Sequence, residues 1–149
     1  QLGPKHNFTL LCRDLSELSN FAKVDNSQYR QLKAHTPGAF TFILEGTREV
    51  PRLLMNPKKR TIGIRVPANA IAMALLEEMG EPLMSSSLIL PGEDLPLADP
   101  YEIRERLEHD LDLVIDGGHC GFEATTVVDM TEEQAVVTRQ GVGDASAFL

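Results

Sequence analysis

Seven short runs rich in apolar, aromatic and β-branched residues recur along the chain, the pattern typical of strands. Gly, Pro, Asn and Asp residues lie close to most of these runs, as expected where strands end in turns. The predicted strands are Phe8–Cys12, Phe40–Leu44, Thr61–Val66, Leu83–Ser87, Leu113–Asp116, Thr126–Asp129 and Ala135–Arg139.

Helix patterns with start and stop signals lie between these runs. In one of them Ile71, Leu75 and Met79 recur every fourth residue, with Asn69 as the N-cap and Gly80 as the stop. Alternation of strands with such helices predicts the α/β class, a mixed sheet flanked by helices. The predicted helices are Ser27–His35 after Asp25 and Asn26, Ala70–Met79, and a segment that begins at Asp99-Pro100 and ends near His109.

Length and composition indicate one ordinary globular domain over residues 1–149. The chain has 42% hydrophobic and 24% charged residues, and no apolar run reaches the ~18 residues that a membrane span needs. The opening residues do not form a charged and then apolar secretion signal. Cys12 and Cys120 lack CxxC spacing, so we expect two free thiols and a cytoplasmic protein with no membrane partner.

Charge is distributed unevenly along the chain. The net charge is −8, yet residues 1–70 carry a net of +6 and residues 71–149 a net of −14. A phosphate-bearing ligand is therefore expected to approach the first half, because a local field steers ligands even in an acidic protein. The alternative is that the two halves intermix in the fold and the asymmetry has no effect.

Standard catalytic and metal-binding motifs are absent. The chain contains no phosphate-binding GxxxxGK[ST] loop, no HExxH and no GxSxG. His119-Cys120 lacks partners at metal-ligand spacing, so no metal site is predicted. The serines at 85–87 are expected to donate hydrogen bonds rather than act as nucleophiles, because no base lies near them in sequence. We therefore assign no catalytic residue.

Arg65 differs from the other cations of the first half. Arg48, Arg52, Lys58, Lys59 and Arg60 lie in or beside predicted loops, where solvated surface is the default. Arg65 lies inside the apolar frame TIGIRVP, and a guanidinium in a strand needs an oxyanion or carbonyl partner. Two interpretations remain open, a clamp for a ligand carboxylate and a structural ion pair.

Five segments taken together resemble the YrdC-like family, which includes the threonylcarbamoyl-AMP synthases and a YciO branch. Their order and spacing match the family across nearly the whole chain, and LDLVIDGGH with RQGVGD is most similar to the YciO branch. The segments are HNFTLLC (His6–Cys12), TPGAFTFIL (Thr36–Leu44), TIGIRVP (Thr61–Pro67), EPLMSSSLILPG (Glu81–Gly92), and ATTVVDM with TRQGVGD (Ala124–Met130 and Thr138–Asp144).

The resemblance implies a twisted mixed sheet around a concave basic surface. It implies a synthase reaction that converts ATP, L-threonine and bicarbonate into threonylcarbamoyl-AMP and pyrophosphate for tRNA modification. It also implies binding of double-stranded RNA or tRNA, with Lys58, Lys59 and Arg60 as contact candidates. Mg²⁺ normally accompanies ATP, and no protein metal cage is expected.

Site residues follow from the same resemblance, position by position. Arg65 and Thr125 correspond to the threonine side of the site. Thr41, Ser85, Ser87 and Arg139 correspond to the ATP side. Arginine and hydroxyl donors suit this chemistry because adenylation depends on positioning and on stabilising developing negative charge.

Two departures from the synthase pattern bear on activity. Ile89 stands where the synthases carry an asparagine, and isoleucine makes no hydrogen bond. The chain also begins just past the family's basic KxR motif, so the resemblance implies a domain that is incomplete at its N-terminus. We therefore expect a YciO-type protein that binds nucleotide and RNA. A working threonylcarbamoyl-AMP synthase and a fold relative that acts through protein contacts are the alternatives.

Overall fold

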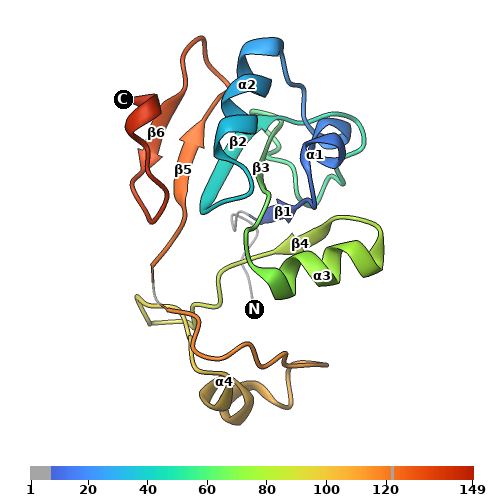
Figure 1. The fold of residues 1–149 in the computed structure, drawn as a ribbon. Helices are drawn as coiled ribbons and strands as arrows, with labels where there is room; N and C mark the ends of the chain where they lie inside the picture. The colour runs from blue at the N-terminus through green and yellow to red at the C-terminus, as the bar shows by residue number, and fades with distance from the viewer. Residues whose placement is uncertain (1–7, 122) are drawn as a thin grey trace. The chain divides into compact units, whose positions relative to one another are not determined.

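The computed structural model describes residues 8–121 and 123–149, and it divides into two compact units (Figure 1). The first unit combines the chain up to Ser86 with Ala124–Leu149, and the second is Ser87–Glu123. His6 and Asn7 of the first family-like segment lie outside the described residues.

The first unit is built on a six-stranded sheet in the order β4-β1-β3-β2-β5-β6. The pairs β1/β3 and β2/β5 are parallel, and the other neighbouring pairs are antiparallel. The sheet is therefore mixed, as predicted. The strands are β1 (Thr9–Leu11), β2 (Phe40–Glu45), β3 (Thr61–Arg65), β4 (Leu83–Ser85), β5 (Thr126–Asp129) and β6 (Val136–Arg139).

Three of the four α-helices begin and end close to the predicted residues. Asp25 and Gln28 form a capping box at the second helix, and Gly80 ends the third in a left-handed conformation with φ 71°. The first helix is an addition to the predicted elements, and Asp14 caps it by accepting the Glu17 N–H at 2.8 Å. The helices are α1 (Leu15–Phe21), α2 (Asn26–His35), α3 (Ala70–Met79) and α4 (Pro100–Leu107), followed by a 3₁₀ turn at Ser146–Phe148.

The hydrophobic core lies on one face of the sheet. Phe42, Ile64 and Val128 of the three central strands are fully buried there, against Leu18 of α1 and Leu32 of α2. Successive strand residues point to opposite faces, so their sequence neighbours lie on the other face. One face of the sheet therefore packs against the helices in the core, and the other face carries polar side chains.

The second unit contains α4 and, in its described residues, no strand. The strand predicted over Leu113–Asp116 is therefore wrong: the apolar run Leu-Val-Ile is present, but the segment is not paired with a strand in the described residues. This unit carries ten Asp or Glu and two Arg, a net of −8 that equals the charge of the whole chain. The first unit is consequently neutral overall, and the positive charge that it carries is concentrated in particular segments.

Both cysteines are free thiols, Cys12 buried and Cys120 exposed. Over the described ranges, no helix is long and apolar enough to cross a bilayer.

Candidate functional site

Arg65 lies at the end of β3 on the face opposite the core. The β2–β3 register pairs Phe42 with Ile64, so the next residues outward, Thr41 and Arg65, lie opposite each other. Thr41 is paired in turn with Val127 of β5, and Val127 with Arg139 of β6. Four adjacent strands therefore place Arg65, Thr41 and Arg139 in one row on one face.

Hydrogen bonds connect the members of this row. Thr41 Oγ1 and Thr125 Oγ1 are 2.7 Å apart. Arg139 donates from Nη2 to Thr125 Oγ1 and from Nε to the Thr125 carbonyl, both at 3.0 Å. We call Arg65, Arg139, Thr41 and Thr125 the arginine–threonine cluster.

One hydroxyl hydrogen of this cluster is left for a ligand. Thr125 Oγ1 already accepts from Arg139, and one threonine hydroxyl donates to the other. Whichever threonine is the donor in that pair, the second O–H has no acceptor among residues 8–121 and 123–149. The positive charge of Arg139 polarises this chain and makes the remaining O–H a stronger donor.

The two arginines have no carboxylate partner in the described part of the chain. Within residues 8–121 and 123–149, neither Arg65 nor Arg139 forms an ion pair, so the structural ion pair considered for Arg65 is absent there. Arg65 Nε is buried and has no hydrogen-bond partner among the described residues. Burial, and then the nearby charge of Arg139, lower the pKa of Arg65. An anion in contact with both guanidiniums would supply the partner and relieve the repulsion.

A second pair of hydroxyls lies on the same face, across β3. Thr9 of β1 is paired with Ser85 of β4, and their Oγ atoms are 2.6 Å apart. Gly63 lies between the two groups: a Cβ built on it would be 3.3 Å from a methyl of Thr9 and 3.3 Å from a methyl of Thr41. Ser85 is among the predicted site residues and Thr9 is not, because only the β1–β4 register shows that the two meet.

Ser87, the other predicted serine, belongs to the second unit. Ile89 lies in that unit as well and is 44% exposed. The structure thus brings together Arg65, Thr41, Thr125 and Arg139, with Ser85 on the same face.

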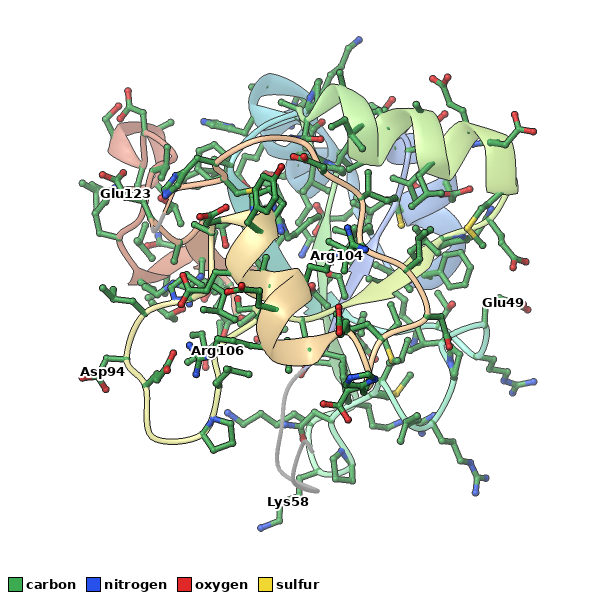
Figure 2. All side chains as sticks on the ribbon, turned by 90° about the horizontal axis from the view of Figure 1, so that it is seen from below. Glu49, Lys58, Asp94, Arg104, Arg106 and Glu123 are labelled. Atoms are coloured by element: carbon green, nitrogen blue, oxygen red, sulfur yellow. The ribbon has the colours of Figure 1, made fainter. Side chains whose placement is uncertain are left out.

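The proposed RNA contacts lie in the loop between β2 and β3, at residues 46–60, which we call the basic loop. Val50 anchors it in the core, and Asn56 Oδ1 accepts the N–H groups of Lys58 and Lys59 at 3.0 Å. Lys58 extends away from the ribbon (Figure 2). The loop carries five exposed cations and one acid, Glu49; the cations are Arg48, Arg52, Lys58, Lys59 and Arg60.

A shallow cavity opens beside this loop. Its volume is about 510 Å³, and its lining includes Arg48, Arg60 and Lys23, whose amino group pairs with Glu45 at 3.1 Å. In the part of the chain that the structure describes, no group of three or more His, Cys, Asp or Glu side chains is arranged to hold a metal ion.

Comparison with known proteins identifies the family. The profile of the Sua5/YciO/YrdC family, described as telomere recombination, matches residues 1–141. The chain belongs to this family. It is 56% identical to the uncharacterized protein YciO of Escherichia coli (strain K12), over the whole chain and 72% of YciO. The threonylcarbamoyl-AMP synthase of Pyrococcus abyssi is a more distant family member, 32% identical over 73% of this chain and 32% of the synthase.

Solved structures of the Sua5/YciO/YrdC family share the fold. The crystal structure of E. coli YciO aligns with a TM-score of 0.93 at 56% identity, covering 99% of this chain and 72% of that one. The structure of P. abyssi Sua5 complexed with L-threonine aligns with a TM-score of 0.83 at 26% identity, covering 93% of this chain and 41% of that one. The α/β fold predicted from the family resemblance is therefore confirmed.

Proposed function

We propose that this protein binds a nucleotide at the arginine–threonine cluster and RNA at the basic loop. The observation that carries the first part is Arg65, whose buried Nε has no partner in the part of the chain that the structure describes. The guanidinium of Arg139, which forms no ion pair in that part either, lies nearby. A buried donor without a partner costs about 1–3 kcal/mol, so its retention in the free protein favours a ligand that completes it. Planar guanidiniums bind carboxylate and phosphate oxygens in pairs, which makes an oxyanion the matching group.

Nucleotide binding is tested by calorimetric titration of ATP with Mg²⁺. The variant is Arg65→Gln, with Arg30→Gln as the control, because Arg30 is an exposed residue of the same unit on α2. Arg65→Gln should weaken ATP binding about tenfold or more, since a hydrogen bond to a charged group contributes about 1.5–3 kcal/mol. Equal affinity of both variants for ATP would rule out this site.

RNA binding is supported by the five exposed cations of the basic loop, which project from a loop whose backbone is anchored. Phosphate contacts of this kind weaken steeply with salt. The basic loop belongs to the first unit, which is neutral overall, so its five cations are a local excess of positive charge within that unit. We place the protein in the cytoplasm, where its free thiols remain reduced.

The RNA test is a titration of a labelled duplex at about 50 and 200 mM salt. Replacing Lys58, Lys59 and Arg60 by alanine should weaken binding and reduce the salt slope by about one for each phosphate that these cations neutralise. Replacing Arg30 and Lys33 of α2 is the control for loss of charge alone. A slope that is the same in both variants would exclude the basic loop as the RNA site.

A second candidate function is threonylcarbamoyl-AMP synthesis. Its support is the relationship to the P. abyssi synthase and to the Sua5 structure with L-threonine, together with the presence of Arg65, Thr41, Thr125 and Arg139. In that function Arg65 would bind the threonine carboxylate, and Arg139 and the free threonine O–H would stabilise charge on the phosphate. Against it stands Ile89, which supplies no hydrogen bond where synthases have asparagine.

Pyrophosphate release separates the two functions. The full-length protein is incubated with ATP, L-threonine and bicarbonate, with each substrate omitted in turn. Turnover that needs all three substrates and is abolished by Arg65→Ala would establish the synthase. Nucleotide binding without turnover would leave the binding function.

A further inference from the structure

Thr126, the first residue of β5, uses its hydroxyl entirely within the protein. It is fully buried, donates to the Gly143 carbonyl at 2.7 Å and accepts the Gly141 N–H at 3.0 Å. Its own N–H donates to the Ala39 carbonyl at 3.0 Å. Thr126 therefore connects β5 with the turn that follows β6.

That turn, residues 140–143, has no room for side chains at its two glycines. A Cβ on Gly141 would collide with the backbone of Ala124 and Thr125. A Cβ on Gly143 would be 2.8 Å from the Ala39 carbonyl oxygen and 2.8 Å from the ring of Phe40. The Val142 N–H also donates to the Ala124 carbonyl at 2.9 Å. The turn is thus held directly against the backbone that carries Thr125.

Arg139 is the residue directly before this turn, and it pairs with β5 next to an irregularity in the sheet. It ends the edge strand β6, and the β5–β6 register shifts between Val127 and Val128, next to its own pairing. Such a bulge disrupts the ladder locally. The side chain of Arg139 is exposed, and a long exposed side chain has considerable rotamer freedom. Compared with the irregular pairing of β6, the closely packed turn at residues 140–143 therefore holds the Arg139 backbone more firmly.

We propose that Thr126 is a positioning residue of the nucleotide site. By holding the 140–143 turn against residues 124–126, it keeps the Arg139 guanidinium on Thr125 and beside Arg65. This inference rests on the proposed function, because it assigns the turn a role in binding the anion. The threonine hydroxyl is the required group, since only a side chain that both donates and accepts satisfies Gly143 and Gly141 together.

Three variants test the proposal, with ATP and Mg²⁺ as the probe. Thr126→Val keeps the shape and removes the hydroxyl, Thr126→Ser keeps the hydroxyl, and Arg139→Gln removes the guanidinium. Thr126→Val and Arg139→Gln should each weaken ATP binding about tenfold, whereas Thr126→Ser stays within about twofold of the natural protein. Because Thr126 acts through Arg139, the double variant Thr126→Val/Arg139→Gln should be no weaker than Arg139→Gln alone.

A second readout needs no ligand. The Arg139 Nε–H donates to the Thr125 carbonyl, so its NMR signal should exchange slowly in the natural protein and in Thr126→Ser, and rapidly in Thr126→Val. Should Thr126→Val not fold, Gln140→Ala loosens the same turn by removing the donor to the Gly143 carbonyl at 3.1 Å, and the same measurements apply with smaller effects.

The outcomes separate the two claims. A protected Nε–H that becomes unprotected in Thr126→Val, with no effect of Arg139→Gln on ATP binding, would support the positioning and refute the nucleotide site. An unchanged Nε–H in Thr126→Val, or multiplicative losses of ATP affinity in the double variant, would overturn the positioning role.

Discussion

Replacement of Arg65 by methionine should make the free protein more stable while removing its ligand response. Arg65 Nε is buried with no partner in the described ranges, and a second guanidinium, that of Arg139, lies nearby. An unsatisfied buried donor costs about 1–3 kcal/mol, and methionine retains an unbranched apolar side chain that fills most of the same space. Cavity and repacking effects offset part of the gain. We expect a net increase of about 1 kcal/mol in the free energy of unfolding.

For a chain of this length, that increase corresponds to a rise of about 2–4 °C in Tm. Urea unfolding without ligand should show a higher midpoint and an unchanged slope. ATP at about 100 times its Kd should stabilise the natural protein by about 2.7 kcal/mol and Arg65→Met by much less. The matched control, Arg30→Met on exposed α2, should stay within about 0.5 kcal/mol of the natural protein in both conditions.

A decisive contrary result is available. If Arg65→Met were about 1 kcal/mol or more less stable without ligand, while Arg30→Met was unchanged, Arg65 would be satisfied in the free protein. The inference that Arg65 lacks an anionic partner in the free protein would then have no basis.

Four further predictions concern Cys12, Asn69 and Leu32. Burial, and then the charges of Glu17 and Asp14, raise the pKa of the Cys12 thiol to about 12 from an ordinary 9.0. A thiol reagent at pH 8 should therefore label Cys120 alone in the folded protein. It should label both cysteines only after unfolding. Because this pKa is raised on folding, Cys12 stabilises the fold fully below about pH 9, and its contribution should be lost progressively as pH rises toward 12, measurable as a falling urea midpoint. Asn69→Ala should destabilise the protein by about 1 kcal/mol and Asn69→Asp by much less, because the side-chain oxygen accepts two N–H groups at the start of α3; equal losses in a thermal melt would contradict the capping role. Leu32→Ala should cost about 2–5 kcal/mol in chemical unfolding, since the side chain is fully buried between α2 and the sheet, and a loss below about 1 kcal/mol would place the core elsewhere.

The helices and strands could largely be predicted from the sequence, because the signals that start and end them are local. Asn69 and Gly80 predict the bounds of α3, and the capping residues Asp25 and Gln28 accompany the predicted start of α2. The same kind of signal exists for α1, where Asp14 and Glu17 have capping-box spacing, although no helix was predicted there. The apolar runs also predict the six observed strands to within two residues at each end.

Which strands pair with one another could not be predicted from the sequence. Leu113–Asp116 has a strand pattern, yet the structure leaves it outside any sheet, because a strand exists only where another strand accepts its backbone hydrogen bonds. The pattern of one segment carries no information about that partner.

The family resemblance implies that the four residues of the arginine–threonine cluster are site residues, but which of them meet follows from the pairing of the strands. The four are Arg65, Thr41, Thr125 and Arg139. Parallel pairing of β2 with β5 brings Thr41 next to Thr125, and the edge strand β6 brings Arg139 across to them. The lack of a partner for Arg65 Nε among the described side chains and backbone groups, and the internal hydrogen bonds of Thr126, are likewise properties of packing. Contacts between residues 84 positions apart, such as Thr41 and Thr125, depend on sheet register. Register follows from the burial of whole faces rather than from any single motif.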